Sequence, residues 1–534
     1  MDTQVVIVGA GPVGLTLAID LGRRGVHCTL IEKNEAPLGY PKMERCNART
    51  MEMFRRIGIA EEVRAAGYPQ DWPMDVYFVF DLMRPPVWKM DYPTVAEAKA
   101  KRDRTNDGTL PLEPYQIISQ YTLEPLLKSI AERIPSLDIR FGHEFLSFAE
   151  TTDGVRVEVR RSDGSTAAIE AQYLVGCDGA SSAVRRQLGL RMEGEPSIRE
   201  MRQALFHCPE LYERVRAPRA RHYHRIDDHW TLFIVQDSRE HFTIHAIVDS
   251  DEDMARLFEA TVGTPVAYEM LHCAKWTQRL LLAEHYARDP VLLAGDACHL
   301  VIPTGGLGMN TGVGDAIDIS WKLAATLQGW GGPNLLPSYE AERRPVGAQN
   351  IKASGQGTTG RATWRSALRP GIDEDTPEAR AALDRLLDIA KREAPKTFRV
   401  GGAELGYRYA GSPVIFDEPG GPEPDYAEFV PTSWPGARLP HVWVDPGRRS
   451  VHDLIRNDRF TLLCLGQPPA EAEAFAGAFK SRRIPIDIVS VDEEAARQVY
   501  GFPYVLLRPD LHVAWRAREL PAQADGIAAR VSGH

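Results

Sequence analysis

Apolar runs of strand length recur along the chain, and the three clearest each end in a turn that contains glycine. The run at 5–8 leads into Gly9-Ala10-Gly11-Pro12-Val13-Gly14, the run at 173–176 into Cys177-Asp178-Gly179, and the run at 291–294 into Gly295-Asp296. Segments that are apolar at every position are typical of parallel strands buried on both faces of a sheet. The pattern therefore predicts an α/β fold built around a parallel sheet.

The first run opens a strand–turn–helix–strand unit. The glycine turn is followed by apolar residues at helical spacing over 15–21, and a second apolar run at 27–31 ends in Glu32. A G-x-G-x-x-G turn is informative only in this context, which is complete here. The unit predicts a Rossmann-like dinucleotide-binding domain, and an ordinary glycine turn in an α/β protein is the weaker interpretation.

Each glycine of the turn has a physical role in such a site. Gly9 allows the tight turn, Gly11 lets backbone N–H groups approach a pyrophosphate, and Gly14 lets the helix pack closely on the strand. The helix N-terminus favours the negative charge of the pyrophosphate. The carboxylate of Glu32 can accept hydrogen bonds from the ribose hydroxyls. Cations in the loop and first turn at 42–49 could contact phosphate or the ribityl chain, or pair with surface acids.

Other parts of the chain follow different patterns. Between 194 and 283 the sequence reads as β-strands, at 222–225, 230–236 and 242–248. The segments at 156–160 and 168–170 alternate around a Ser-Asp-Gly turn, which predicts a hairpin. A polar stretch at 97–107 predicts a mobile loop, and a long helix is expected to begin at Val313.

These changes of pattern divide the chain into seven segments. They are a first FAD-binding segment at 1–72, substrate-domain strands with the mobile loop at 73–113, a second FAD-binding segment at 114–193, a β-rich substrate domain at 194–283, a third FAD-binding segment with a helical connector at 284–396, a linker at 397–440, and a separate α/β unit at 441–534.

Composition narrows the class of protein. The formal net charge of the 534 residues is −10, which argues against a nucleic-acid partner. No apolar stretch reaches the roughly eighteen residues of a membrane span, and no signal peptide precedes the first strand. The seven cysteines are scattered and lack C-x-x-C spacing. We therefore expect a cytoplasmic protein with no membrane partner, no disulfide framework and no metal site.

Three separated signatures carry a resemblance to a known family. The opening glycine turn with Glu32, the strand end Asp178-Gly179, and Gly295-Asp296 with its Pro/Gly-rich sequel together resemble the group A flavoprotein aromatic hydroxylases, which include p-hydroxybenzoate and phenol hydroxylases. Asn47-Ala48-Arg49-Thr50-Met51-Glu52 and Ser119-Gln120 are also similar to that family. The resemblance implies a FAD-binding domain of the glutathione-reductase type with a β-sheet substrate domain.

The resemblance also implies a reaction. FAD is the resident cofactor, NADPH or NADH is the reducing co-substrate, and O2 supplies the oxygen that a flavin C4a-hydroperoxide transfers to a phenolic ring. The flavin carries the redox chemistry, and the protein binds, orients and excludes water. The residues expected at the cofactor are Gly9, Gly11, Pro12, Gly14, Glu32, Lys33, Lys42, Arg45, Gln120, Asp178, Asp296, Pro303, Gly308, Met309 and Asn310.

The C-terminal unit resembles the thioredoxin-like domain of the phenol-hydroxylase and polyketide-oxygenase branches. Cys464 stands alone there, without the second cysteine that thiol–disulfide exchange needs. We therefore expect a structural domain or a subunit contact, which leaves a homodimer open, and not a redox module.

A phenol is a better nucleophile as phenolate, so the site needs a base or a strong acceptor near the substrate hydroxyl. The histidine-rich strands offer His224, and the loop after the first unit offers Glu44. Strand alternation puts His222 and His224 on one face and Tyr223 on the other. The residues expected at the substrate are Tyr223, Gln236, His245 and Pro303.

Two alternatives to a phenol hydroxylase stay open. One is a polyketide-tailoring oxygenase, with Baeyer–Villiger insertion as a variant on the same scaffold. The other, of a different class, is a FAD-binding sensor or sequestering protein without turnover. The intact Asp296 and glycine loop argue against the second alternative.

Overall fold

A six-stranded sheet forms the centre of the first domain in the computed structural model, which describes residues 1–237, 239–423 and 425–534. Its strands, in the order β17-β18-β11-β1-β2-β7, are β1 (Val5–Val8), β2 (Cys28–Ile31), β7 (Leu137–Arg140), β11 (Tyr173–Gly176), β17 (Ala287–Arg288) and β18 (Val291–Leu293). All neighbours are parallel except β17 and β18. The three apolar runs therefore lie side by side as β1, β11 and β18, and the predicted parallel sheet is confirmed.

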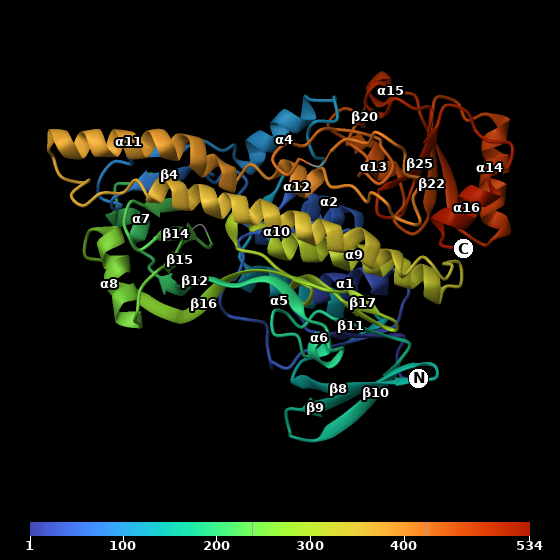
Figure 1. The fold of residues 1–534 in the computed structure, drawn as a ribbon, viewed down its shortest axis with the longest axis horizontal. Coiled ribbons are helices and arrows are strands. Elements are labelled where there is room, and N and C mark those ends of the chain that lie inside the picture. Colours follow the sequence, from blue (N-terminus) through green and yellow to red (C-terminus); the bar gives the residue numbers. More distant parts are fainter. Residues whose placement is uncertain (238, 424) are drawn as a thin grey trace.

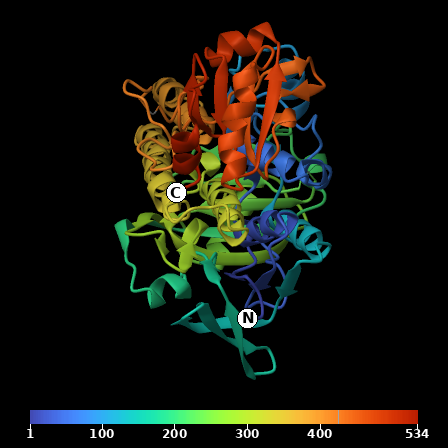
Figure 2. The ribbon, with the colours of Figure 1, turned by 90° about the vertical axis from the view of Figure 1, so that its right-hand side faces the viewer.

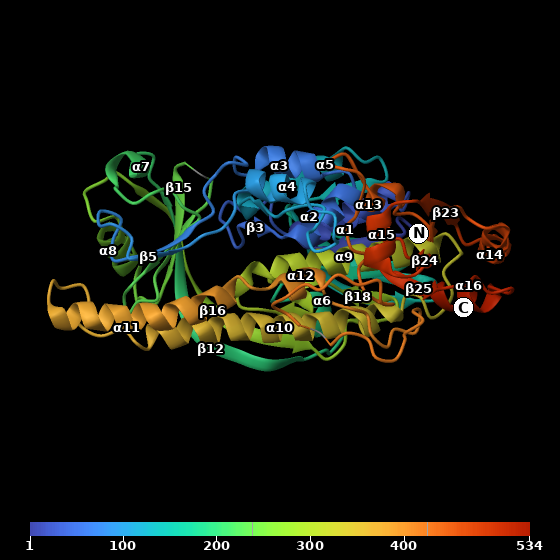
Figure 3. The ribbon, with the colours of Figure 1, turned by 90° about the horizontal axis from the view of Figure 1, so that it is seen from above.

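Helices pack beside this sheet, and α10 continues beyond it toward the substrate domain. α1 (Pro12–Arg23) follows β1 and packs against α9 (Gly308–Leu327). α10 (Ser338–Arg365) then runs from the first domain to the substrate sheet, where α11 (Pro377–Glu393) packs beside it (Figure 3). α10 thus packs against elements of both domains.

The substrate domain is an eight-stranded sheet. Its strands, in the order β19-β16-β12-β15-β14-β13-β4-β5, are β4 (Val76–Val79), β5 (Trp88–Met90), β12 (Met192–His207), β13 (His222–Arg225), β14 (Leu232–Val235), β15 (His241–Ala246), β16 (Glu269–Ala283) and β19 (His299–Leu300). β13, β14 and β15 agree with the strands expected at 222–225, 230–236 and 242–248. β19 follows the Gly295-Asp296 turn directly, so the sheet is joined to the first domain at that turn.

The two faces of this sheet differ in character. One face packs its aromatic residues, among them Phe206, Tyr223 and Phe233, into a core with α8 (Asp251–Val262). The opposite face carries His222, His224 and His245 and turns toward α10, as the electrostatic influence of the α10 residue Arg361 on these histidines indicates. A period of two along each strand separates the apolar from the polar set.

The C-terminal domain is a second, smaller α/β unit. Its sheet has the order β23-β22-β24-β25, formed by β22 (Phe460–Leu465), β23 (Ile486–Val491), β24 (Tyr504–Leu507) and β25 (Val513–Ala517). β22 pairs parallel with β23 and antiparallel with β24, and the helices are α14 (Ala470–Ser481), α15 (Glu494–Tyr500) and α16 (Asp525–Val531). Figure 1 shows this domain at the end of the molecule opposite α11, and Figure 2 shows it at the top, with the small sheet formed within residues 143–171 at the bottom.

Two expectations about single elements were wrong. The stretch at 97–107, expected to be a mobile loop, lies largely in α4 (Val95–Asp103), which starts with a reciprocal capping box between Thr94 and Glu97. The long helix expected from Val313 begins five residues earlier at Gly308, because the glycines of the preceding loop continue directly into its first turn. The hairpin at 156–170 is confirmed as β9 (Gly154–Arg161) with β10 (Thr166–Ala171).

The remaining elements are short or lie at domain boundaries. They are β3 (Arg45–Cys46), α2 (Ala48–Arg56), α3 (Ala60–Ala66), β6 (Gln116–Ile117), α5 (Gln120–Glu132), β8 (His143–Thr151), α6 (Ala183–Gln187), α7 (Leu211–Arg214), α12 (Gly401–Leu405), β20 (Trp443–Asp445), β21 (Arg449–Ser450) and α13 (Val451–Leu454). Among the described residues, no helix combines the length and the apolar character that crossing a membrane requires.

Candidate active site

The glycine turn forms a cradle that is closed on two sides and open on the third. A Cβ on Gly9, whose φ is +105°, would lie 2.5 Å from the carbonyl oxygen of Cys177, and a Cβ on Gly14 would lie 2.0 Å from that of Gly9. A Cβ on Gly11 would meet nothing within 4 Å. Gly9 and Gly14 are therefore required by the fold itself, while the open side of Gly11 is the space that a pyrophosphate needs.

The acid at the end of β2 is held in place by the turn. The Ala10 N–H donates to Glu32 Oε2 at 3.0 Å, and Asn34 donates from its backbone to Oε1 at 2.9 Å. Pro12 occupies the first turn of α1, where its missing N–H costs nothing. Lys33 is exposed beside Glu32. The carboxylate thus stands at the rim of the cradle in a fixed orientation, as a ribose contact would require.

The opposite rim is formed by Asp296 and the start of α9. Asp296 keeps accessible surface although it lies deep in the molecule, where burial raises its pKa against the effect of His299 and Lys42. No side chain among the described residues caps α9, so the N–H groups of Gly308 and Met309 are left without intrahelical acceptors. An open glycine, an uncapped helix N-terminus and a deep, accessible carboxylate together fit FAD.

Several other residues expected at the cofactor are engaged by the protein. Arg45 Nη2 donates to the Gly305 carbonyl at 2.8 Å and pairs with Glu404 of α12, which lies within the stretch expected to be a linker. The Asn310 side chain accepts from Asn47 N at 2.8 Å and donates to the Arg45 and Gly306 carbonyls. These side chains fix the glycine loop against β3, and contacts of their own with FAD remain predictions.

Gln120 and Asp178 are similarly placed. Gln120 donates to Glu124 in the same helix. Asp178 Oδ2 accepts from Ala183 N at 2.6 Å and from Val184 N at 3.1 Å, which caps α6, while its Oδ1 is buried without a partner. Contacts of either residue with FAD remain predictions.

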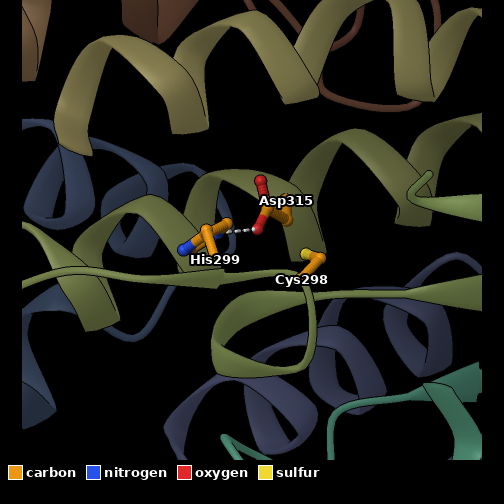
Figure 4. A group of neighbouring side chains, drawn as sticks. All are labelled: Cys298, His299 and Asp315. Carbon is orange, nitrogen blue, oxygen red and sulfur yellow. Dashed lines mark hydrogen bonds and ion pairs between the residues drawn. The ribbon is translucent and has the colours of Figure 1, made fainter. Parts of the chain in front are cut away.

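A buried group beside the cradle has the composition of a metal site. The ligand atoms of Cys298, His299 and Asp315 lie within 4.8 Å of one another (Figure 4). Asp315 already accepts from His299 Nε2 at 2.7 Å, from Arg343 Nε at 2.8 Å and from Gly295 N at 3.1 Å. These bonds tie the turn that carries Asp296 to α9, and we interpret the group as the support of that rim.

Two consecutive residues join the cradle to the substrate sheet. Arg45 holds the glycine loop before α9, as described above, while Glu44 pairs with Arg221 at the start of β13. Glu44 Oε1 also lies 3.1 Å from His222 Nε2. The polar face of the sheet is therefore adjacent to the N-terminus of α9.

Glu44 is an ionised carboxylate in a deep but accessible position. Its side chain is 15% exposed. Burial favours the neutral acid, but Arg221 and His222 together hold the pKa of Glu44 well below its ordinary value. The side chain therefore offers a permanent negative acceptor and is a weak base.

His224 has no comparable partner. Its ring lies 5.1 Å from that of Phe78 and 6.2 Å from that of Trp364, and its Nδ1 is buried without a hydrogen bond. Burial and then the charges of Arg361 and Arg365 lower its pKa well below the ordinary value. The imidazole is neutral and enclosed, which gives a base at this position no route to a substrate proton.

The structure places the four residues expected at the substrate in different environments. Tyr223 lies on the apolar face with its hydroxyl donated to the Pro218 carbonyl at 2.7 Å, so its side chain points away from the polar face. Gln236 accepts from Ser119 at the start of α5. His245 is partly accessible on the polar face, where burial lowers its pKa to about 3, and Pro303 is exposed before the glycine loop.

The polar face also contains groups that sequence patterns alone do not single out. Thr243 and His222 are each less than 6% exposed, and the Thr243 hydroxyl and His222 Nδ1 have no partner among the described residues. Buried polar atoms are normally hydrogen-bonded, so a bound polar ligand or a water would satisfy these two atoms. Their common position follows from cross-strand register: His222 faces Ile234, and Ile234 faces Thr243.

Fold and site together define a flavoprotein, and sequence comparison identifies its family. Residues 2–354 match the FAD binding domain family and residues 432–533 match the family "Aromatic-ring hydroxylase, C-terminal". The chain therefore belongs to the FAD-dependent aromatic-ring monooxygenases, and its C-terminal unit is the domain typical of them.

Individual relatives support this assignment over the whole length. The chain is 32% identical to the FAD-dependent monooxygenase apdD of Emericella nidulans, over 99% of this chain and 90% of that protein. It is 29% identical to phenol 2-monooxygenase of a Pseudomonas species, over 98% and 91%. Among solved structures, it is similar to the rebeccamycin biosynthetic enzyme RebC with reduced flavin (TM-score 0.89, 32% identity, 99% of each chain). It is also similar to aklavinone-11 hydroxylase with FAD and aklavinone (TM-score 0.83, 27% identity, 100% and 99%).

Proposed function

We propose that this monooxygenase hydroxylates a phenolic ring that binds on the polar face of the eight-stranded sheet, with NADH or NADPH as reductant. The observation that carries the proposal is the pair Glu44 and Arg45, in which one residue holds the sheet and the next holds the glycine loop at the cofactor. A ring bound beside Glu44 lies next to the N-terminus of α9.

Bound FAD supplies the reduction of O2 and the electrophilic oxygen, and the chain supplies the surroundings. The open side of Gly11 and the N–H groups at the start of α9 bind the negative parts of the cofactor. The same helix terminus would favour negative charge on the flavin ring. Glu44 is only 15% exposed, and limited access of water at that depth would protect a reactive oxygen species from loss.

Glu44 is proposed as the acceptor for the substrate hydroxyl. A hydrogen bond from a phenol to an ionised carboxylate is short and strong, and it raises the electron density of the ring. Arg221 and His222 keep the carboxylate ionised, so full removal of the proton before oxygen transfer is unnecessary. Glu44 acts here as a hydrogen-bond acceptor, and His224 is not assigned a catalytic role.

The test compares Glu44→Gln with His224→Asn, a matched control on the same face of the sheet. Glu44→Gln should keep FAD and its reduction but release more hydrogen peroxide per NAD(P)H, because it loses a charge-assisted hydrogen bond worth roughly 1.5–3 kcal/mol. His224→Asn should remain coupled. Equal coupling in both variants would remove Glu44 from the mechanism.

The pH dependence separates an acceptor from a base. Because the pKa of Glu44 lies below its ordinary value, the wild-type ratio of product to NAD(P)H should be flat from about pH 5.5 to 8. A loss of coupling with a midpoint near neutrality would indicate a different titrating group.

A further inference from the structure

Arg361 of α10 is a deep cation without an acidic partner in the described part of the chain. It donates through Nη2 to the Trp230 carbonyl at 2.7 Å, while its Nε has no partner. Burial, followed by the charges of Arg365 and Arg199, lowers its pKa well below the ordinary value. Arg361 is nevertheless only half-buried, so the protein does not enclose it completely.

The nearest carboxylate is already shared. Asp227 lies 3.1 Å from Arg225 Nη1 and 3.4 Å from Arg365 Nη1, and it also accepts from Thr231. An unpaired cation in the interior is strongly unfavourable unless something neutralises it. The protein residues described here do not provide the neutralising charge.

A second arginine reinforces the excess of positive charge. The guanidinium carbon of Arg199 lies 3.3 Å from the centroid of the Trp230 ring, and Arg199 Nη1 is buried without a partner. Burial alone lowers the pKa of Arg199, and no acid acts against it. Trp230 itself has a φ of +59°, a conformation that bulky residues rarely adopt. The guanidinium carbons of Arg361 and Arg365 lie 5.7 and 5.5 Å from the same centroid, so three arginines surround one indole ring.

These cations border the polar face of the sheet. Trp364, three residues after Arg361 on α10, has its ring 6.2 Å from that of His224 on this face. The charges of Arg361 and Glu44 both act on His222 and His245. Both imidazoles are neutral, so neither adds to nor balances the arginines. Glu44 and Arg361 form no ion pair with each other. They flank the same polar surface and carry opposite charges.

We propose that Arg361, assisted by Arg199, binds a carboxylate of the substrate, which makes the substrate a hydroxylated aromatic acid. The inference rests on the proposed function and specifies its substrate class. The planar guanidinium has parallel N–H donors that match both oxygens of a carboxylate, whereas a phenolate offers one oxygen. A ring with its hydroxyl at Glu44 and its carboxylate at Arg361 binds in one orientation only.

The test uses matched ligands that differ in the carboxylate alone. 3-Hydroxy-2-naphthoate, 1-hydroxy-2-naphthoate and 4-hydroxybenzoate are compared with their methyl esters, which keep the phenol. Binding to the oxidised, FAD-loaded protein is followed by tryptophan fluorescence without turnover, and stimulated NAD(P)H oxidation is measured separately. The variants are Arg361→Gln and Arg361→Lys, with Arg380→Gln as control, since the Arg380 side chain is 60% exposed on the neighbouring helix α11.

At least one acid should bind wild type about 10–100-fold more tightly than its ester, as expected for a charge-assisted bidentate contact. Arg361→Gln should remove the preference for the acid, while ester binding and flavin content stay unchanged. Arg361→Lys should retain part of the preference, and Arg380→Gln should retain all of it. If no acid binds more tightly than its ester, or if Arg361→Gln weakens acid and ester equally, the inference is overturned.

Two further outcomes distinguish this inference from the function on which it rests. Esters or simple phenols that are hydroxylated while the acids are not would leave the hydroxylase intact and refute the carboxylate. The esters could instead bind more tightly as their phenol ionises, and Arg361→Gln could abolish this pH dependence. That result would assign Arg361 to a phenolate and would also refute a carboxylate at Arg361. Absence of product from every ligand in a flavin-loaded, reducible enzyme would contradict the proposed function itself.

Discussion

Replacement of Gly11 by valine should abolish FAD binding without disturbing the fold. The N-cap residue Gly11 has φ −70° and ψ 177°, an extended conformation that valine adopts readily. A Cβ at this position meets no protein atom within 4 Å. The added isopropyl group therefore enters only the space assigned to the pyrophosphate.

The size of the effect follows from the hydrogen bonds that the valine would block. Charge-assisted hydrogen bonds contribute roughly 1.5–3 kcal/mol each. Loss of two N–H contacts to the pyrophosphate would weaken binding by about 3–6 kcal/mol, which corresponds to about 10²–10⁴-fold in Kd at 1.4 kcal/mol per factor of ten. The variant should purify colourless.

The assay combines the ratio of flavin to protein absorbance, FAD titration of the apoprotein and far-UV circular dichroism. Two controls bracket the variant. Gly14→Val should misfold, because its Cβ would lie 2.0 Å from the Gly9 carbonyl oxygen. Gly477→Val, in an open position of the C-terminal helix α14, should keep its flavin. A folded Gly11→Val protein with full flavin occupancy would refute the assignment of the cradle.

The remaining predictions concern acid stability and the lone C-terminal cysteine. Burial lowers the pKa of His441 to about 2 and that of His512 to about 4. Below about pH 6.5 the unfolded chain therefore binds more protons than the folded chain, and the free energy of unfolding decreases as the pH falls. His441→Asn should reduce the pH slope of the unfolding free energy between pH 6 and 5 by about 1.4 kcal/mol per unit, and an unchanged slope in denaturant titrations would show that His441 is not buried neutral. Burial raises the pKa of the Cys464 thiol to about 11. Cys464→Ser should therefore leave NAD(P)H oxidation and product yield near wild type. A large loss of activity in a stable variant would contradict a purely structural domain.

The parts of the fold that sequence reasoning predicted are those fixed by local pattern. β1, α1 and β2 follow from a continuous apolar run, a glycine turn and helical periodicity within thirty residues. The C-terminal unit was likewise predicted as α/β, and its four strands are short apolar segments separated by turn residues. α4 was missed because it is mostly exposed and polar, and its signal was the capping box of Thr94 and Glu97.

The site was harder to predict because its parts are distant in sequence. Glu44 was recognised as a candidate, but its pairing with Arg221 and His222 joins residues about 177 positions apart and depends on how β13 docks against the loop after β2. Arg361 lay in a stretch interpreted only as a helical connector. Its importance follows from burial and from the absence of an acidic partner among the described residues, which no local pattern expresses.

The central claim is that this flavoprotein transfers one oxygen atom from O2 to a phenolic ring. The direct measurement is isotope labelling under ¹⁸O2 with purified protein, NAD(P)H and the aromatic acid or ester that most stimulates NAD(P)H oxidation. We predict one ¹⁸O atom in the added hydroxyl and close to one product per NAD(P)H consumed. A hydroxyl that derives from water, or a panel in which no aromatic compound accelerates NAD(P)H oxidation by the flavin-loaded protein, would contradict the account.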